Sequence, residues 1–228
     1  MERHTLRVVA RIHGEFPAKF GVPRQSGLVP ELLSRVVFEP EFRSAEALRG
    51  IEGFSHLWLI WQFSQNARKD GWSPTVRPPR LGGNVRMGVF ATRSPFRPNP
   101  LGLSCVKLER VEWEGGDAPA LIVSGADLVD GTPIYDVKPY VPYADAHPDA
   151  RGGFASSAAE TVDVVFPPEL LALVPEERRA ALRGVLAQDP RPRYQNDPAR
   201  VYGMRFGALE VKFRVADGVL TVVGVEKR

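Results

Sequence analysis

The sequence contains very little cysteine and histidine, and this scarcity excludes several classes of site. Cys105 is the only cysteine among 228 residues, so an internal disulfide framework is impossible and a reducing cytoplasm is the expected compartment. The four histidines, at positions 4, 13, 56 and 147, show no H-E-x-x-H or C-x-x-C spacing, so no metal site is expected. We expect Cys105 to be a small apolar residue of a strand rather than a nucleophile.

Long hydrophobic runs and glycine-rich nucleotide motifs are also missing. The longest apolar run, HLWLIWQF at 56–63, is far shorter than the ~20 residues of a membrane-spanning helix, so no membrane association is expected. The N-terminal stretch lacks the apolar core of a signal peptide. No G-x-G-x-x-G, P-loop or G-x-S-x-G motif is present, so the sequence supports neither a Rossmann-type nor a P-loop site, nor a hydrolase nucleophile elbow.

The overall composition is that of an ordinary globular protein. Hydrophobic residues make up 43% and charged residues 25% of the chain, and the net charge of +3 is mildly basic. A small positive charge permits nucleic-acid binding but does not establish it. The length suits one large domain, or one domain with a small appendage.

Short β-rich runs separated by Pro- and Gly-rich loops dominate the first two thirds of the chain. This pattern predicts a mainly β fold with a single-sheeted antiparallel β-barrel, and the lack of long helices between strands argues against a parallel sheet. A short helix is expected at 44–50, after a Ser N-cap and before a Gly stop. The expected strands are 7–12, 35–38, 56–63, 85–91, 104–111, 120–123 and 161–166.

The C-terminal third has a different organisation. Residues 145–160 are small and polar and are interpreted as a linker. A helix is expected at 175–187, and alternating apolar residues at 209–215 and 219–225 around Asp217-Gly218 predict a hairpin. We therefore expect a β-barrel domain at 1–150 and a small α+β domain at 160–228.

Two proline-braced segments are the strongest candidates for a functional site. MGVFATRSPFRPNPLG at 87–102 carries Arg93 and Arg97 among three prolines, and DGTPIYDVKPY at 130–140 is interpreted as a second loop of the same kind. Prolines hold such loops extended, and guanidinium groups suit an anionic or planar ligand. Residues 136–140, DVKPY, loosely resemble the [DN]-P-P-[YFW] loop of adenine N6-methyltransferases, but alone this is a weak signal.

Several further segments have both a functional and a structural interpretation. FGVPRQSG at 20–27 is either a surface turn or a ligand loop, and the polar end of the 56–65 segment either terminates a core strand or lines a pocket. His56 is more consistent with a hydrogen-bonded core histidine than with an acid or base. Arginines concentrated beside aromatics suit RNA, where they contact phosphates and stack with bases, although they also suit a solvated loop. They are Arg77, Arg80, Arg86, Arg93 and Arg97.

Taken together, six segments resemble the TrmO family of tRNA adenine N6-methyltransferases. The matching segments are KFGVPRQSGLV, LRGIEGFSHLWLIWQF, PTVRPPRLGG, MGVFATRSPFRPNPLGLS, DLVDGTPIYDVKPYVPYAD and QDPRPRY, which extend from about residue 19 to 194. The resemblance implies a single-sheeted β-barrel enzyme that uses S-adenosylmethionine. It implies methylation of N6 of the threonylcarbamoyl-modified adenosine beside the anticodon, and a homodimer with the cofactor near the subunit interface.

The resemblance also implies the site residues. Some relatives have His at the position of Ser64, so there only a backbone contact would be kept. The implied cofactor residues are Gln25, Ser26, Gly27, Ser64, Gln65, Arg93, Leu103, Asp130, Gly131, Thr132 and Pro133.

For catalysis, we expect Asp136 to accept a hydrogen bond from the adenine N6–H and Tyr140 to stack on the base, although Asp136 serving only to brace its loop stays an alternative. QDPRPRY at 188–194 is expected to contact the anticodon stem-loop. The predicted RNA-binding residues are Arg77, Arg80, Arg97, Arg191, Arg193 and Tyr194. Two competing hypotheses remain, a non-catalytic RNA-binding β-barrel and a small-molecule-binding regulatory protein; binding of S-adenosylmethionine separates the enzyme from a pure RNA binder.

Overall fold

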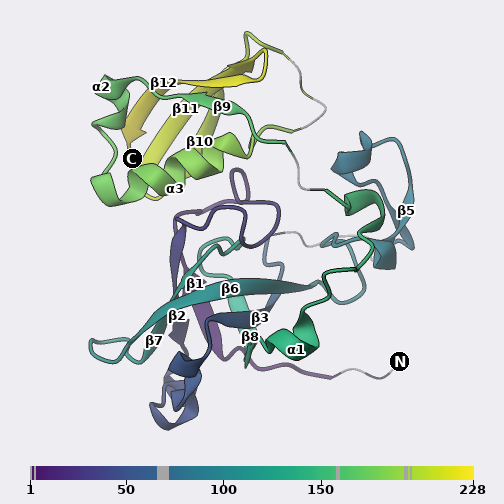
Figure 1. Cartoon of the computed structure of the whole chain (residues 1–228), viewed down its shortest axis with the longest axis vertical. Coiled ribbons are helices and arrows are strands. Elements are labelled where there is room, and N and C mark those ends of the chain that lie inside the picture. The colour runs from purple at the N-terminus through teal and green to yellow at the C-terminus, as the bar shows by residue number, and fades with distance from the viewer. Residues whose placement is uncertain (1, 3, 66–71, 158–159, 193–194, 196) are drawn as a thin grey trace.

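Six antiparallel strands form a closed barrel in the lower half of the molecule (Figure 1). The coordinates are a computed structural model, which describes residues 2, 4–65, 72–157, 160–192, 195 and 197–228. The strand order is β1-β2-β7-β6-β3-β8, and β8 closes the barrel against β1. The expected single-sheeted antiparallel barrel is confirmed. Its strands are β1 (Ala10–His13), β2 (Leu33–Phe38), β3 (His56–Gln62), β6 (Leu101–Glu112), β7 (Ala120–Ser124) and β8 (Pro133–Pro139).

Every second side chain along the strands points into the barrel and fills its core. In β3, Leu57, Leu59 and Trp61 are buried, while the residues between them are half-buried on the outer face. A period of two places alternate residues on opposite faces of a sheet, so the apolar set of β3 points into the core. The same rule leaves the outer face of the barrel partly apolar.

The prediction that residues 130–140 form a loop is wrong, because most of this segment is the barrel strand β8. It pairs with β3 on one side and with β1 on the other. Pro133 and Pro139 stand at its first and last positions, where a missing N–H costs least. Ile134 is fully buried. The pairing of β8 with β3 shifts register between Ile60, which faces Asp136, and Trp61, which faces Ile134.

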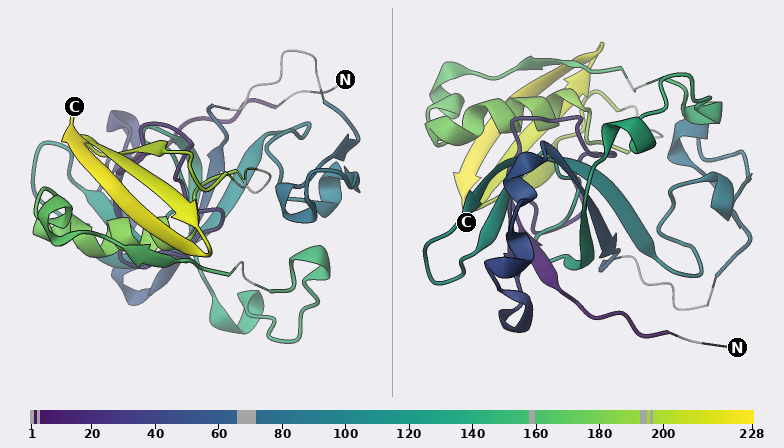
Figure 2. Two further views of the ribbon diagram at one scale, coloured as in Figure 1. Left: turned by 90° about the horizontal axis from the view of Figure 1, so that it is seen from above. Right: turned by 60° about the horizontal axis from the view of Figure 1, so that its bottom comes forward.

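The other barrel-side predictions differ mainly in extent. The strand expected at 85–91 is only β5 (Met87–Gly88), paired with β4 (Thr75–Val76) and followed by a 3-10 turn. This segment stands beside the barrel in all the ribbon views (Figures 1 and 2). The helix expected at 44–50 is one of several 3-10 turns. These are η1 (Pro40–Phe42), η2 (Glu46–Leu48), η3 (Ile51–Gly53), η4 (Pro79–Leu81), η5 (Val89–Ala91) and η6 (Gly153–Ala155).

A four-stranded sheet with the order β10-β11-β12-β9 forms the upper half of the molecule. The expected helix is α3 (Glu176–Ala187), and the expected hairpin is β11 (Leu209–Ala216) with β12 (Val219–Lys227). The 161–166 run contributes only β9 (Asp163–Val165), parallel to β12. The sequence analysis missed β10 (Tyr202–Phe206). Two short helices complete the fold, α1 (Pro142–Asp145) and α2 (Pro168–Leu171).

The core of the upper sheet is built partly by the N-terminal half of the chain. Phe16, Val29 and Leu32, from the segment between β1 and β2, are buried against α3 and the strands β10–β12. The barrel has a separate core of its own. The segment between β1 and β2 therefore joins the two halves. None of the helices in the described part of the chain is long and apolar enough to span a membrane.

Candidate active site

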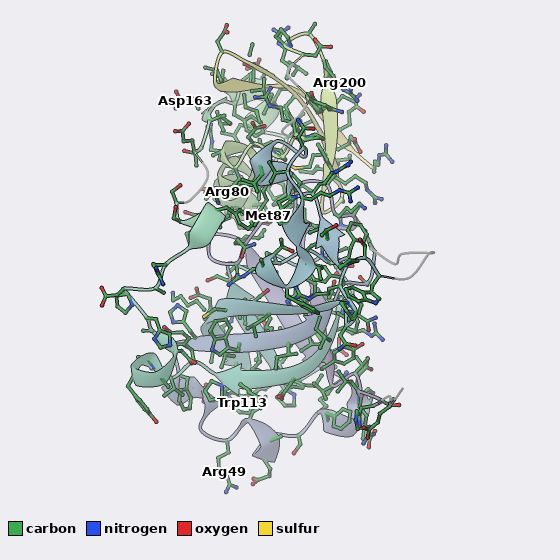
Figure 3. All side chains as sticks on the ribbon, turned by 90° about the vertical axis from the view of Figure 1, so that its right-hand side faces the viewer. Arg49, Arg80, Met87, Trp113, Asp163 and Arg200 are labelled. Carbon is green, nitrogen blue, oxygen red and sulfur yellow. The ribbon has the colours of Figure 1, made fainter. Side chains whose placement is uncertain are left out.

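One end of the barrel gathers most of the predicted cofactor residues. Because neighbouring strands are antiparallel, the ends of β1, β3 and β7 and the starts of β2, β6 and β8 meet there. Gln25, Ser26 and Gly27 lie between β1 and β2, Ser64 and Gln65 follow β3, Arg93 precedes β6, and Asp130, Gly131, Thr132 and Pro133 lead into β8. This end faces the upper sheet, whereas Arg49 and Trp113 lie toward the opposite end of the barrel (Figure 3).

Direct contacts join residues 25–27 to Arg93 and to the residue that follows β7. Arg93 donates a hydrogen bond from Nη1 to Oε1 of Gln25, although the two residues are 68 positions apart. The N–H of Gly27 donates to the carbonyl of Gly125, just after β7, at 2.8 Å. A Cβ on Gly125 would lie 3.1 Å from Cα of Gly27, and both residues have positive φ. Glycine is therefore needed for this close backbone approach.

Gln65 and Asp130 are hydrogen-bonded to the main chain of the residues that follow β1. Gln65 donates from Nε2 to the carbonyl of Pro17 at 3.3 Å. Asp130 accepts a hydrogen bond from the N–H of Gly14 at 3.2 Å. Thr132 is buried, and its hydroxyl donates to the carbonyl of Val129 at 2.6 Å. Its N–H also donates to the carbonyl of Val129 and its own carbonyl accepts from the N–H of Ile12, both at 3.2 Å, so Thr132 holds the loop to β1.

Asp127, which the sequence analysis missed, lies behind these loops. Its Oδ1 accepts a hydrogen bond from the hydroxyl of Ser104 at 2.5 Å, and Ser104 in turn accepts from Nε1 of Trp61 at 2.9 Å. Burial raises the pKa of Asp127, while hydrogen bonds from Ser104 and from the backbone N–H groups of Asp127 and Ser26, and the charge of Arg93, oppose that rise. The only sequence signal was an acid placed shortly after the buried strand β7, whose first four residues are apolar.

Asp136 lies on the outer face of the barrel, in one row with Leu103. Register pairs Leu103 of β6 with Ile60 of β3, and Ile60 with Asp136 of β8. Directly paired residues present their side chains on the same face, so the three lie side by side across the sheet. The carboxylate of Asp136 is 2.8 Å from Nζ of Lys138 and accepts a hydrogen bond from the N–H of Val137 at 3.0 Å. The side chain of the predicted catalytic carboxylate is 45% exposed. Both of these contacts come from its own strand.

Tyr140 lies at the far end of β8. Its N–H donates to the carbonyl of His56, the first residue of β3. Its ring centroid is 5.8 Å from that of Trp58 and 6.1 Å from that of His56. At about 3.3 Å per residue, Tyr140 is roughly 20 Å along the strand from Pro133. The structure thus does not bring Tyr140 to the cofactor loops of its own chain.

The predicted RNA-binding arginines fall into two groups. Arg77 is exposed, Arg80 donates to Ser157, and Arg97 donates to the carbonyl of Thr92 at 3.0 Å; Figure 3 shows Arg80 at the level between the barrel and the upper sheet. Arg191 binds the carboxylate of Asp189 through Nε at 2.9 and 3.0 Å, and its side chain is only 15% exposed. Arg193 and Tyr194 lie outside the described residues.

Comparisons with known proteins agree with this architecture. The family model described as the tRNA-methyltransferase O N-terminal domain matches residues 11–146, and the TrmO C-terminal domain matches residues 159–228. The tRNA (adenine(37)-N6)-methyltransferase of Escherichia coli is 45% identical over 226 residues, with 95% of each chain covered. A putative S-adenosylmethionine-dependent methyltransferase, RcsF of Pseudomonas aeruginosa, is 43% identical with 91% of each chain covered. The crystal structure of TrmO from Pseudomonas aeruginosa superposes with a TM-score of 0.82 at 33% identity, over 99% of both chains.

Proposed function

We propose, because the chain belongs to the TrmO family of tRNA methyltransferases, that it transfers a methyl group from S-adenosylmethionine to N6 of the threonylcarbamoyl-modified adenosine beside the anticodon of tRNA. The observation that carries the proposal is the meeting of Gln25 and Arg93. These residues come from the two segments with the most distinctive motifs, and their side chains are hydrogen-bonded at the loop end of the barrel.

The residues at this end fit the chemistry of S-adenosylmethionine. Arg93 is exposed and offers a guanidinium to a carboxylate. The side of Gly27 where a Cβ would stand has no atom within 4 Å, so a ligand can approach there closely. Leu103 is 54% exposed and offers an apolar surface. Ser64 and Gln65 are also exposed at the end of β3. S-Adenosylmethionine supplies a methyl group that is already activated by the sulfonium, so the main task of the protein is to orient the acceptor nitrogen.

Asp136 is our candidate for this orientation. An exposed carboxylate accepts hydrogen bonds only, so Asp136 would accept the N6–H and leave the nitrogen lone pair directed at the methyl group. Nζ of Lys138 lies 2.8 Å from this carboxylate, on the same strand. Tyr140 remains the candidate for base stacking, although it lies at the other end of β8.

A homodimer accounts for the position of Asp136 and Tyr140 on the outer face. The outer face of β3, β6 and β8 carries Trp58, Ile60 and Leu103 in neighbouring rows around Asp136. Large apolar side chains on an outer sheet face favour contact with another protein surface. We propose that a second copy covers this face and brings its cofactor loops toward Asp136. Replacing Ile60 with Arg should then convert the dimer to a monomer in sedimentation analysis, and an unchanged mass would contradict the dimer contact.

The two halves of the chain would divide the work. Residues 1–150 would hold the cofactor and the catalytic groups, and residues 160–228 would contact the anticodon stem-loop together with Arg77, Arg80 and Arg97. The mild excess of positive charge is compatible with tRNA as partner. Because tRNA is the proposed substrate, we propose the cytoplasm as the site of action.

Incubation with methyl-labelled S-adenosylmethionine and tRNA, followed by nucleoside analysis, tests the function. We expect label on N6 of the threonylcarbamoyl-modified adenosine with wild-type protein, and a strongly reduced single-turnover rate for Asp136→Asn at saturating cofactor. Asp163→Asn, on the edge strand β9 of the upper sheet, is the matched control and should keep the wild-type rate. RNA binding without cofactor binding would instead identify a non-catalytic RNA-binding barrel, and an Asp136→Asn rate equal to wild type would remove Asp136 from the mechanism.

A further inference from the structure

We propose that Lys138 binds the threonyl carboxylate of the modified adenosine and so makes the enzyme specific for that base; this inference rests on the proposed function. Nζ of Lys138 lies 2.8 Å from Oδ2 of Asp136, the carboxylate that would accept the N6–H. The threonylcarbamoyl group is attached to the same N6 atom, and it ends in a carboxylate. A cation beside Asp136 is therefore placed where the charged end of the substituent can reach it.

The length of the substituent matches the spacing of the two side chains. A hydrogen bond of about 2.9 Å from N6 to Oδ2 of Asp136 would place N6 less than about 6 Å from Nζ of Lys138. The carboxylate carbon of the substituent lies about 5 Å from N6 when the substituent is extended, at the bond lengths of a peptide-like chain. Because its ammonium has three donors, Lys138 can contact Asp136 and the threonyl carboxylate together.

The described strands β3, β6 and β8 supply one suitable cation to this part of the outer face. Lys138 is the only cationic residue of β8, and β3 contains neither lysine nor arginine. The two cations of β6, Lys107 and Arg110, form ion pairs with Glu109 at 3.0 Å and Glu112 at 3.2 Å. Lys138 is thus the cation that these strands place beside the predicted catalytic carboxylate.

The surroundings of Lys138 suit a ligand better than a structural ion pair. Its side chain is 61% exposed, and an ion pair at such a site adds little to the stability of a fold. Register places Lys138 opposite Trp58, whose indole is fixed by a hydrogen bond from Nε1 to Oδ2 of Asp145 at 3.1 Å. Attraction between the ammonium and a carboxylate is stronger beside an apolar ring than in open water.

The test compares two full-length tRNAs that differ only in the threonyl group, which ends in a carboxylate in one and in a neutral carboxamide in the other. Since hydrogen bonds to charged groups are the strong ones, wild-type kcat/KM should be about tenfold or more higher for the carboxylate tRNA. In Lys138→Met this preference should disappear, because kcat/KM falls for the carboxylate tRNA alone. Lys138→Arg keeps a cation and should keep part of the preference. Lys138→Gln takes the place of Lys138→Met if the latter does not fold.

Lys107→Met is the matched control. Lys107 also pairs with a carboxylate two positions along its own strand, that of Glu109, but it faces His56 at the start of β3. The preference for the carboxylate tRNA should therefore be unchanged in this variant. Both kcat/KM values are measured with one protein, so a loss of stability or of a subunit contact affects the two tRNAs alike and leaves their ratio unchanged.

Three outcomes would overturn the inference. If wild-type protein methylates both tRNAs with the same kcat/KM, the threonyl carboxylate is not recognised, although the proposed function stands. If Lys138→Met keeps the wild-type preference, with or without a loss of overall rate, Lys138 does not contact the substituent. If wild-type protein transfers no methyl group to N6 of the modified adenosine, the proposed function falls, and this inference falls with it.

Discussion

The guanidinium of Arg24 donates from Nη2 to the main-chain carbonyl of Asp189, 3.3 Å away and 165 positions along the chain. The same nitrogen is 3.3 Å from the carbonyl of Arg191. Arg24 directly precedes Gln25, whose amide donates to the carbonyl of Arg24 and whose oxygen accepts from Arg93. A short series of contacts thus links the proposed tRNA loop after α3 to the proposed cofactor loop. A cavity of about 290 Å³ lies between residues 19–24 and the end of α3, beside this link.

Replacing Arg24 with Met should weaken both tRNA and cofactor binding. The substitution removes the two bonds to the 189–191 segment, so both loops lose a shared support, and losses of about three- to tenfold are expected for bonds of this kind. Fluorescence anisotropy with tRNA and calorimetry with S-adenosylmethionine measure the two affinities. Arg214→Met, on the exposed face of β11, makes the same change in charge and should affect neither. A loss confined to tRNA would show that the two loops act separately.

Arg77 and Arg191 should differ in how they affect the salt dependence of tRNA binding. Arg77 is exposed, so a phosphate contact through it would contribute about 0.7–0.9 to the slope of log K against log salt concentration, and Arg77→Ala should remove this amount. Arg191 is already bound to Asp189, so Arg191→Ala should weaken binding by releasing the loop and leave the slope unchanged. A slope that falls for Arg191→Ala would mean that Arg191 leaves Asp189 to bind RNA.

The sequence predicted correctly those elements that are determined by neighbouring residues along the chain. The hairpin of β11 and β12 follows from alternation around Asp217-Gly218, since that turn requires positive φ at both residues and both have it. The inward residues of β3 follow from the same period. These signals need no knowledge of the rest of the chain.

Other elements depend on partners that the local sequence does not reveal. β8 has proline at both ends and charged residues within, and only pairing with β1 and β3 makes it a strand. β10 carries an alternating apolar set in Tyr202, Met204 and Phe206, but Gly203 weakens the strand signal. Motifs identified the loops of the site, whereas Asp127 required the fold, because its hydrogen-bond partner Ser104 lies 23 positions away on another strand.

Gly102→Ala should destabilise the barrel at the entrance to β6. A Cβ at this position would lie 2.3 to 2.6 Å from three ring atoms of Trp61, so the ring or the strand must move. Overpacking of this kind costs about 1–3 kcal/mol, measurable as a lower midpoint of urea unfolding. Gly116→Ala, where an added Cβ meets nothing within 4 Å, is the control and should leave the midpoint unchanged. A stable Gly102→Ala protein with weakened cofactor binding would place the effect in the site rather than in the fold.

The last prediction concerns pH and the contact between the two halves of the chain. Burial raises the pKa of Glu15 above its ordinary 4.5, with Asp130 and Glu177 acting in the same direction and Arg178 opposing them. The folded protein then holds this proton more tightly than the unfolded chain, so the contribution of Glu15 to stability falls as pH rises through 4.5 toward the folded pKa. Glu15→Gln should therefore gain stability relative to wild type over that window. Urea unfolding at a series of pH values measures the difference.

Glu112→Gln supplies a control of opposite sign. The hydrogen bond from Arg35 lowers the pKa of Glu112, so its stabilising contribution is complete above 4.5 and is lost as pH falls through the lowered value. The Glu112→Gln protein should accordingly lose stability relative to wild type as pH rises toward 4.5 and change little beyond it. As pH rises, Glu15→Gln should thus gain stability relative to wild type above pH 4.5, whereas Glu112→Gln should lose stability relative to wild type below pH 4.5. The opposite result, a Glu15→Gln protein that becomes relatively less stable with rising pH, would contradict this prediction. It would mean that the ion pair of Glu15 with Arg178, at 3.2 Å, stabilises the fold more than the burial of the carboxylate destabilises it.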